Sequence, residues 1–212
     1  MRILYAASEA APYAKSGGLA DVAGALPKAL VRDGIDCRVV MPLYNDLKFK
    51  DTLTYVTNFS VPVGWRSQYC GLFKAEYDGV TFYFIDNEYY FKRSGLYGFY
   101  DDGERFAFFA RAILEMLFYT DFEPDIINCN DWQTALTPVY LNLYYRHLDK
   151  FNRIKTVFTI HNIAYQGKYG LDILEDTCGI GNRDAHVVEY DGCANFMKGA
   201  IETADKVTTV SP

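Results

Sequence analysis

The chain has 212 residues, a length that one α/β domain with insertions fills and that leaves no room for a second full domain. Half of the residues are hydrophobic and 23% are charged, which is ordinary for a globular protein and argues against a disordered chain. The net charge of -6 repels polyanions, so neither a nucleic acid nor an anionic membrane surface is expected as the main partner.

The first forty residues predict a βαβ unit. An apolar strand over residues 3–7 leads through a glycine-bearing loop to a helical stretch over 19–32, and a second strand follows over 37–41. Gly34 ends the helical stretch, and this order predicts parallel strands joined by a right-handed crossover. Pro27 lies inside the helical stretch and argues against an unbroken helix.

The next part of the chain changes to short β-like runs. Strands are expected over residues 56–63, 69–77 and 80–85, and the pair Asp78-Gly79 favours a tight hairpin turn between the last two. We expect this segment to form a hairpin-rich insertion or an edge of the sheet.

Strand and helix alternate over the remainder. Helices are expected over residues 104–119, 132–146 and 194–204, and strands over 125–129, 156–160 and 207–210, with a long loop after 160. The alternation predicts an α/β fold with an open, mostly parallel, Rossmann-like sheet and helices on both faces. The chain stops where its last strand would pass to another connection, so we expect residues 1–212 to be one domain of a longer protein.

Five cysteines are scattered without a Cys-x-x-C pair, and none stands at metal-ligand spacing from the three histidines. We expect reduced thiols and no metal site. The N-terminus runs straight into an apolar strand and shows neither a signal-peptide core nor a transmembrane length. A cytoplasmic protein of a bacterium is therefore expected.

Polar residues stand directly after the predicted parallel strands, where open α/β sheets bind their ligands. They are Ser8 and Glu9, Asn130 and Asp131, His161 and Asn162, and Ser211. Two roles stay open for Asp131, which either contacts a ligand or caps the helix that follows. His161 likewise either hydrogen-bonds a substrate or caps its own loop.

The first loop carries Lys15-Ser16-Gly17-Gly18-Leu19 at the start of a predicted helix. Two glycines there let backbone N–H groups approach a phosphate, helped by the helix dipole and the lysine charge. The alternative is a turn that needs positive φ at one of the glycines. The pattern is neither a P-loop nor a dinucleotide fingerprint, and no acid ends the second strand, so NAD binding is disfavoured.

Four motifs stand out along the chain. They are Ile3-Leu4-Tyr5-Ala6-Ala7-Ser8-Glu9, Lys15-Ser16-Gly17-Gly18-Leu19-Ala20-Asp21-Val22, Asn130-Asp131-Trp132-Gln133 and His161-Asn162-Ile163-Ala164-Tyr165-Gln166-Gly167. In this order and at this spacing they resemble the N-terminal domain of bacterial glycogen synthases and plant starch synthases, and the resemblance covers essentially the whole chain.

The resemblance implies one half of a GT-B fold and a retaining transfer of glucose from ADP-glucose to the non-reducing end of an α-1,4-glucan. It implies no metal and no other cofactor. The expected partners are ADP-glucose, the glucan and a C-terminal domain outside this chain, which supplies the Arg and Lys that hold the diphosphate and a Glu near the sugar. This chain alone is then expected to be inactive.

The resemblance also assigns site residues. His161 and Asp131 are expected at the catalytic centre, with His161 hydrogen-bonding a hydroxyl of the donor glucose. The expected donor-binding residues are Lys15, Gly17, Gly18 and Asn162. The expected residues of the acceptor side of the cleft are Glu9, Tyr97 and Trp132.

Two alternatives stay open at this stage. The high aromatic share of 17% fits a core filled with large rings, but also sugar stacking in a non-catalytic glucan- or nucleotide-binding module. The other alternative is a GT-B transferase that uses another nucleotide sugar, since a fold alone does not fix a function.

Overall fold

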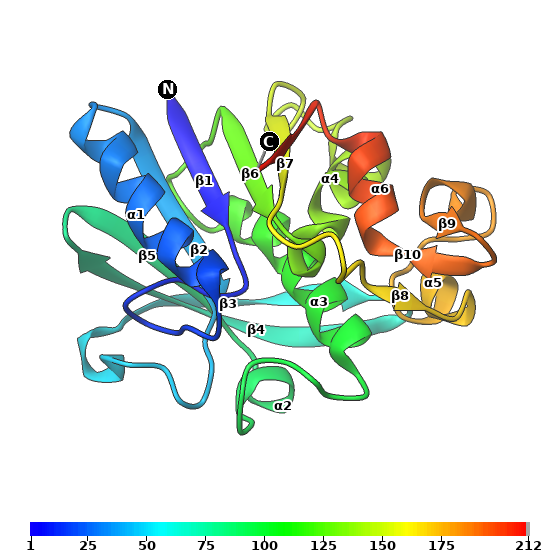
Figure 1. Ribbon diagram of the computed structural model, residues 1–212, viewed down its shortest axis with the longest axis horizontal. Coiled ribbons are helices and arrows are strands. Elements are labelled where there is room, and N and C mark those ends of the chain that lie inside the picture. The colour runs from blue at the N-terminus through cyan, green and yellow to red at the C-terminus, as the bar shows by residue number, and fades with distance from the viewer. Residues whose placement is uncertain (211–212) are drawn as a thin grey trace.

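The central sheet has eight strands in the order β11-β7-β6-β1-β2-β5-β4-β3, in a computed structural model that describes residues 1–210 (Figure 1). The parallel strands are β1 (Arg2–Ala6), β2 (Asp36–Pro42), β5 (Val80–Asp86), β6 (Ile126–Asn130), β7 (Lys155–Ile160) and β11 (Lys206–Thr209). The antiparallel strands β3 (Thr54–Val63) and β4 (Arg66–Tyr77) extend one edge. The predicted open, mostly parallel sheet is confirmed.

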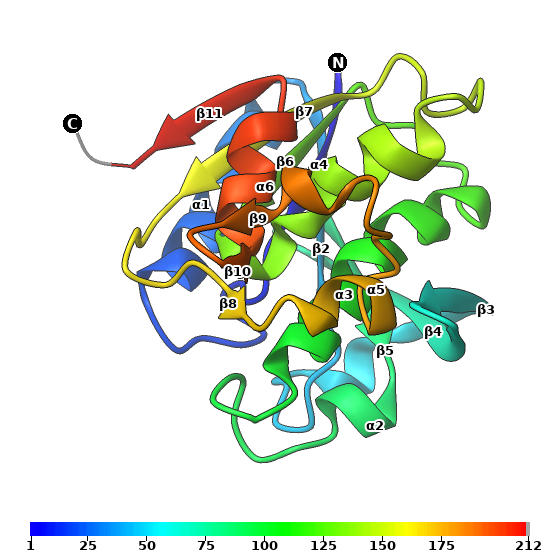
Figure 2. The ribbon, with the colours of Figure 1, turned by 90° about the vertical axis from the view of Figure 1, so that its right-hand side faces the viewer.

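The helices cover both faces of this sheet (Figures 1 and 2). Helix α1 (Gly18–Arg32) packs on one face, and the other face carries α3 (Asp102–Glu115), α4 (Leu136–Tyr140) and α6 (Phe196–Thr203). The chain passes from β1 to β2 in one direction and from β6 to β7 and β11 in the other. Right-handed crossovers that run in opposite directions put their helices on opposite faces and leave a switch point between β1 and β6.

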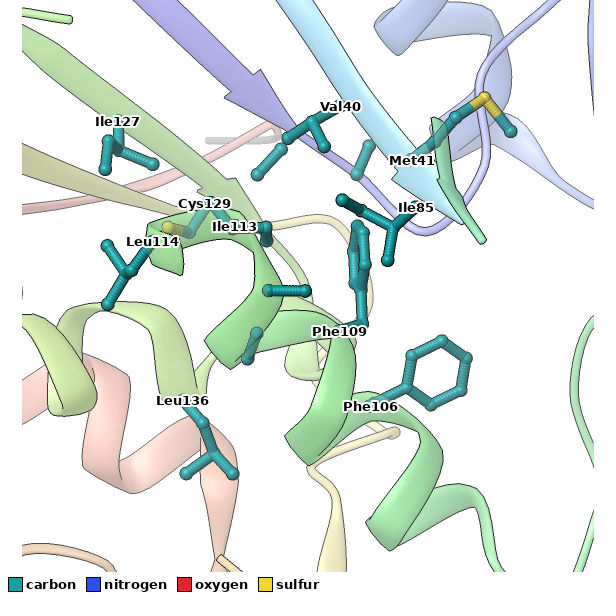
Figure 3. Packing of buried hydrophobic residues seen from close by; sticks show 14 of the residues in the cluster. Val40, Met41, Ile85, Phe106, Phe109, Ile113, Leu114, Ile127, Cys129 and Leu136 are labelled. Carbon is teal, nitrogen blue, oxygen red and sulfur yellow. The ribbon is translucent and has the colours of Figure 1, made fainter. Parts of the chain in front are cut away.

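The core lies between α3 and the sheet. Helix α3 is buried nearly all round its axis, and only Glu104, Arg111 and Glu115 are half-buried. Figure 3 shows its side chains in one cluster with residues of β2, β5, β6 and α4. The labelled members are Val40, Met41, Ile85, Phe106, Phe109, Ile113, Leu114, Ile127, Cys129 and Leu136.

The hairpin signal in the sequence is confirmed. Asp78 and Gly79 join β4 to β5 with φ of 51° and 81°, the two positive values that a tight turn of this kind needs. Since β5 pairs in parallel with β2, the hairpin strands are an edge of the main sheet and not a separate insertion.

Two of the predicted helices differ in their course and not only in their bounds. Helix α1 continues through Pro27, because this residue lies on the buried face with Leu19 and Ala23, and burial of that face outweighs the lost hydrogen bond. The helix expected over 132–146 is instead a 3₁₀ turn, the short α4 and one turn of π-helix.

The loop expected after residue 160 contains structure of its own. A small sheet in the order β8-β10-β9 consists of β8 (Lys168–Tyr169), β9 (Glu189–Tyr190) and β10 (Cys193–Asn195). Helices α2 (Glu88–Phe91) and α5 (Asp172–Asp176) were also not expected. Elements of two to five residues are too short to show a period in the sequence.

Helix α6 begins at Phe196, later than expected, because the side chain of Asn195 caps it by accepting a hydrogen bond from the Lys198 N–H at 3.0 Å. Ser211 lies outside the described residues. Over residues 1–210, none of the helices combines the length and the apolar character that crossing a membrane requires.

Candidate functional site

A cleft of about 820 Å³ opens where β1, β6 and β7 end, beside the switch point of the sheet. The residues that line it come from the loops after these strands, the start of α1, the segment that leads into α3 and the end of β11. They are Glu9, Ser16, Gly17, Gly18, Leu19, Val22, Tyr97, Gly98, Asp102, Asp131, Trp132, Gln133, His161, Asn162, Tyr165 and Val210. The structure thus brings together every site residue that the family resemblance assigns, except Lys15. Of the other polar residues expected at this edge, Ser8 and Asn130 are fully buried and do not line the cleft.

Asp131 connects the ends of two neighbouring strands. Its Oδ1 accepts hydrogen bonds from the backbone N–H of His161 at 2.8 Å and of Asn162 at 3.2 Å. Its side chain does not cap the following turn, so the capping alternative is wrong. With φ of 57° the residue stores backbone strain of about 1–3 kcal/mol, as residues at functional sites often do. Burial raises the pKa of the carboxyl, while the two N–H groups lower it.

His161 is half-buried at the end of β7, and its ring faces inward. Nε2 lies 2.8 Å from Oδ1 of Asn130, the last residue of β6. Burial lowers the pKa of the imidazole, and the nearby Asp131 carboxylate opposes that shift in part. The ring is therefore neutral at pH 7, which suits a hydrogen-bonding role better than charge stabilisation.

The two glycines of the first loop are not required by the backbone. Gly17 has φ of -151° and ψ of -161°, an extended conformation open to any residue, and neither Gly17 nor Gly18 has positive φ. The turn alternative is therefore wrong. A Cβ at Gly18 would meet no atom within 4 Å, and one at Gly17 would only touch Oε1 of Glu9 at 3.7 Å. Because glycine has no side chain, Gly17 and Gly18 leave free space in the cleft at the start of α1.

Lys15 is the exception among the predicted site residues. Its Nζ lies 2.7 Å from Oδ1 of Asp21, and both side chains are more than half exposed. The structure does not place the lysine charge in the cleft. An exposed ion pair of this kind contributes little free energy, so the lysine can exchange Asp21 for another anion at small cost.

The three residues expected on the acceptor side build the cleft wall. The carboxylate of Glu9 is buried and accepts a hydrogen bond from the Ser16 N–H, which shapes the glycine loop. The Tyr97 hydroxyl lies 2.7 Å from Ser8 Oγ, and burial raises the pKa of that phenol. Trp132 is nine-tenths buried.

The loop after β7 packs closely against the indole of Trp132 at Gly167. It has φ of 66°, and a Cβ there would stand 2.7 Å from Cε3 of Trp132. Only glycine meets both demands, because an added methyl group would be strained by the backbone and blocked by the ring. The indole of Trp132 therefore packs against the loop at Gly167 and also lines the cleft.

The charged side chains that line the cleft are acidic. They are Glu9, Asp102 and Asp131, and the lining residues within the described part of the chain include no lysine or arginine. Asp102 forms an ion pair with the buried Arg105 behind the lining at 2.5 Å, whereas Glu9 and Asp131 form no ion pair within residues 1–210. The N-terminus of α1, which has no side-chain cap, directs the positive end of its helix dipole at the cleft. An anionic ligand therefore needs additional cations from elsewhere.

Comparison with known proteins decides the family. The profile of the family described as "Starch synthase catalytic domain" matches residues 2–212. The chain belongs to this family. It is 54% identical over 216 residues to the glycogen synthase of Geobacillus thermodenitrificans and 56% identical over 218 residues to that of Clostridium acetobutylicum. The matches cover all of this chain but only 44% and 45% of the two relatives, so the chain spans less than half of their length.

A solved starch synthase has the same fold. The catalytic domain of starch synthase IV from Arabidopsis thaliana, bound to ADP and acarbose, matches with a TM-score of 0.89 at 32% identity. The match covers all of this chain and 45% of that one. It confirms the predicted fold class, one half of a GT-B fold. The alternative of a non-catalytic glucan- or nucleotide-binding module is not favoured.

Two residues of the cleft, Asp102 and Gln133, were not predicted as site residues from the sequence. Asp102 accepts a hydrogen bond from the Gly98 N–H at 2.7 Å and so closes the irregular segment before α3, which carries no periodic signal. The Oε1 of Gln133 is buried at the cleft without a hydrogen-bond partner among residues 1–210. Gln133 stood in a matched motif, but only the fold shows that its amide is unsatisfied.

Metal binding has no support from the geometry of the described residues. Within residues 1–210, no group of three or more His, Cys, Asp and Glu side chains could hold a metal ion. That the reaction needs no metal and no other cofactor stays a prediction from the family resemblance.

The pH dependence of stability should report on His161. Because its folded pKa lies below 6.5, the unfolded chain binds more protons as the pH falls through this value, and the folded state loses stability on the acid side. We expect the urea midpoint of the wild type to fall between about pH 6.5 and pH 5. H161Q should flatten this fall, and H186Q, which changes an exposed histidine, should not. An equal slope in wild type and H161Q would contradict the buried, neutral ring.

Proposed function

We propose that the protein containing this chain transfers glucose from ADP-glucose to the non-reducing end of an α-1,4-glucan, with retention of configuration, in a bacterial cytoplasm. The observation that carries the proposal is the space left by Gly17 and Gly18 at the start of α1, opposite His161, in a member of this family. The ADP bound to the Arabidopsis starch synthase supports an adenine nucleotide as the donor part, and the acarbose supports a glucan site.

The donor diphosphate is proposed to bind at the glycine loop. With no side chains at Gly17 and Gly18, the backbone N–H groups at the start of α1 approach the phosphates, where the helix dipole favours negative charge. Lys15 leaves Asp21 to join them. As glucose departs, negative charge grows on the diphosphate, and donors already in place stabilise the transition state more than the ground state.

The sugar is proposed to lie against the end of β7. His161, neutral at pH 7, hydrogen-bonds a hydroxyl of the donor glucose, and Asn162 contacts the donor beside it. Asp131 acts by holding the backbone of both residues, as its two hydrogen bonds indicate. Glu9, Tyr97 and Trp132 form the wall along which the acceptor glucan approaches.

A second domain outside this chain is proposed to complete the site. The charged lining residues described here are all acidic, with no lysine or arginine among them, whereas a diphosphate carries negative charge of its own. The partner domain therefore supplies the Arg and Lys that neutralise it and the Glu near the sugar. The two halves together form the GT-B cleft.

Calorimetry with two donors tests the proposed substrate. The protein at its natural length should bind ADP-glucose at least tenfold more tightly than UDP-glucose, a difference of about 1.4 kcal/mol. Measured glucose incorporation into glycogen should show the same preference. A clear preference for UDP-glucose would refute the proposed donor and leave the family assignment intact.

Gly18→Ala tests the space in the cleft. The methyl group meets no atom of the chain and φ is not positive, so the melting temperature should stay the same or rise slightly. The KM for ADP-glucose should rise about tenfold, because the methyl group occupies the path of the phosphates. Gly79→Ala is the matched control, since its φ of 81° lies in a remote hairpin. It should lower the melting temperature and leave the KM unchanged, and an unchanged KM in G18A would contradict the proposed loop.

A further inference from the structure

Asn130 occupies a fully buried position behind His161 and is bonded on all sides. It ends β6, one residue after Cys129, which pairs with Ala6 of β1. Its Nδ2 donates to the backbone oxygen of Ala6 at 3.0 Å and to Oδ1 of Asn128 at 2.7 Å. A backbone carbonyl only accepts hydrogen bonds, so the nitrogen of the Asn130 amide must face Ala6 and its oxygen must face away.

The oxygen of Asn130 therefore faces two donors. The hydroxyl of Tyr5 donates to Oδ1 at 2.9 Å, and Nε2 of His161 lies 2.8 Å from the same atom. Burial raises the pKa of Tyr5, so this phenol keeps its proton. An amide oxygen has two acceptor sites, and both are used here only if Nε2 of His161 carries a proton.

We propose that Asn130 is a positioning residue that holds His161 as the neutral tautomer with its proton on Nε2, leaving Nδ1 as an acceptor for a hydroxyl group of the sugar. The role toward the sugar rests on the proposed function, whereas the tautomer does not. Within residues 1–210, Nδ1 has no hydrogen-bond partner, so its lone pair is available to a ligand. Tyr5 supports the arrangement from behind by fixing the amide oxygen.

The proposal also explains why a neutral amide stands at this position. A carboxylate there would face Nε2 directly and favour the imidazolium, which would put a proton on Nδ1 and remove the acceptor. Besides His161, the titratable groups that line the cleft or contact Asn130 are Tyr5, Glu9, Tyr97, Asp102, Asp131 and Tyr165. Of these, Asp131 already favours the charged ring, and an uncharged Asn130 adds nothing to that effect.

Nitrogen NMR of the protein at its natural length, labelled with ¹⁵N in histidine alone, tests the tautomer. H161Q identifies the signals of His161 by their loss. We expect Nε2 at the position of a protonated nitrogen and Nδ1 at that of an unprotonated one at pH 7. A proton on Nδ1, or on both nitrogens, would overturn the proposal, and this result needs no substrate, no activity and no variant at Asn130.

Two aspartate variants then test whether Asn130 is the cause. N130D puts a charge on Nε2 and should raise the pKa of His161 by about one unit or more. N128D makes the same change two residues earlier on β6, where the side chain contacts Asn130 and not the ring, and should shift that pKa much less. Equal shifts would show a general field effect and refute the positioning role. If N130D does not fold, the wild-type tautomer remains decisive.

Rate measurements separate this proposal from the proposed function. With ADP-glucose and glycogen, N130D should lower kcat more at pH 6 than at pH 8, because the charged fraction of His161 is larger at pH 6. If no glucose is transferred by the wild type, the proposed function fails and the tautomer result stands. If transfer occurs and His161 carries its proton on Nδ1, only the positioning role fails.

Discussion

A chain that ends at Pro212 should transfer no measurable glucose from ADP-glucose to glycogen, a loss of more than about 10⁴-fold against the protein at its natural length. The cleft lining in this chain brings Glu9, Asp102 and Asp131 together and includes no lysine or arginine among its described residues. A diphosphate placed there meets repulsion from Glu9 and Asp131, since Asp102 is paired with Arg105, and it meets attraction from the start of α1. The negative charge that grows on the departing diphosphate in the transition state would then have few positive groups to stabilise it.

Two controls make this result interpretable. Circular dichroism and a cooperative melting curve must show that the shortened chain is folded, as its single continuous core leads us to expect. Mixing it with a separately produced C-terminal half should restore part of the activity if the halves associate. Turnover by the folded, shortened chain alone would contradict the division of the site between two domains.

The sequence was informative where elements are long and buried. The strands over residues 3–7, 125–129 and 156–160 appear as apolar runs because both faces of a parallel sheet are covered. Their order and the handedness of crossovers then place Glu9, Asp131 and His161 at one edge before any coordinates are known. The cleft follows from topology, and the structure confirms that these residues line it.

The contacts within the cleft were beyond sequence reasoning. Asp131 precedes a helical turn, which made capping plausible, but the adjacency of β6 and β7 offers it the backbone of His161 and Asn162 instead. Lys15 was assigned by motif, yet Asp21, six residues later and one turn into α1, takes its charge. Such choices depend on which partners lie within about 3 Å once the chain is packed, and the linear pattern does not contain that information.

Asp131→Ala should be the most damaging single substitution in this chain, lowering kcat about 10³-fold. It removes the acceptor for two backbone N–H groups and leaves them unpaired, at a cost of about 1–3 kcal/mol each. It also puts alanine at φ of 57°, which aspartate tolerates better. The segment carrying His161 and Asn162 would then move, and a displacement of about 1 Å at a reacting centre costs 10²-fold or more.

Asp131→Asn separates positioning from charge. The amide oxygen still accepts from His161 and Asn162, so the loop should stay in place and kcat should fall only about tenfold. Loss of the carboxylate also removes the group that raises the pKa of His161, so that pKa should fall further below its usual value. Steady-state rates with ADP-glucose and glycogen give kcat, and histidine NMR gives the pKa.

Asp205→Ala is the matched control at the other end of the same strand. The Asp205 carboxylate accepts from the Thr156 N–H at 2.9 Å at the start of β7, remote from the cleft, much as Asp131 accepts from His161 at its end. D205A should lower the melting temperature and leave kcat nearly unchanged. If D131N proves as damaging as D131A, the charge of Asp131 and not its hold on the backbone is what the reaction requires. Near-normal kcat in D131A would remove Asp131 from the site altogether.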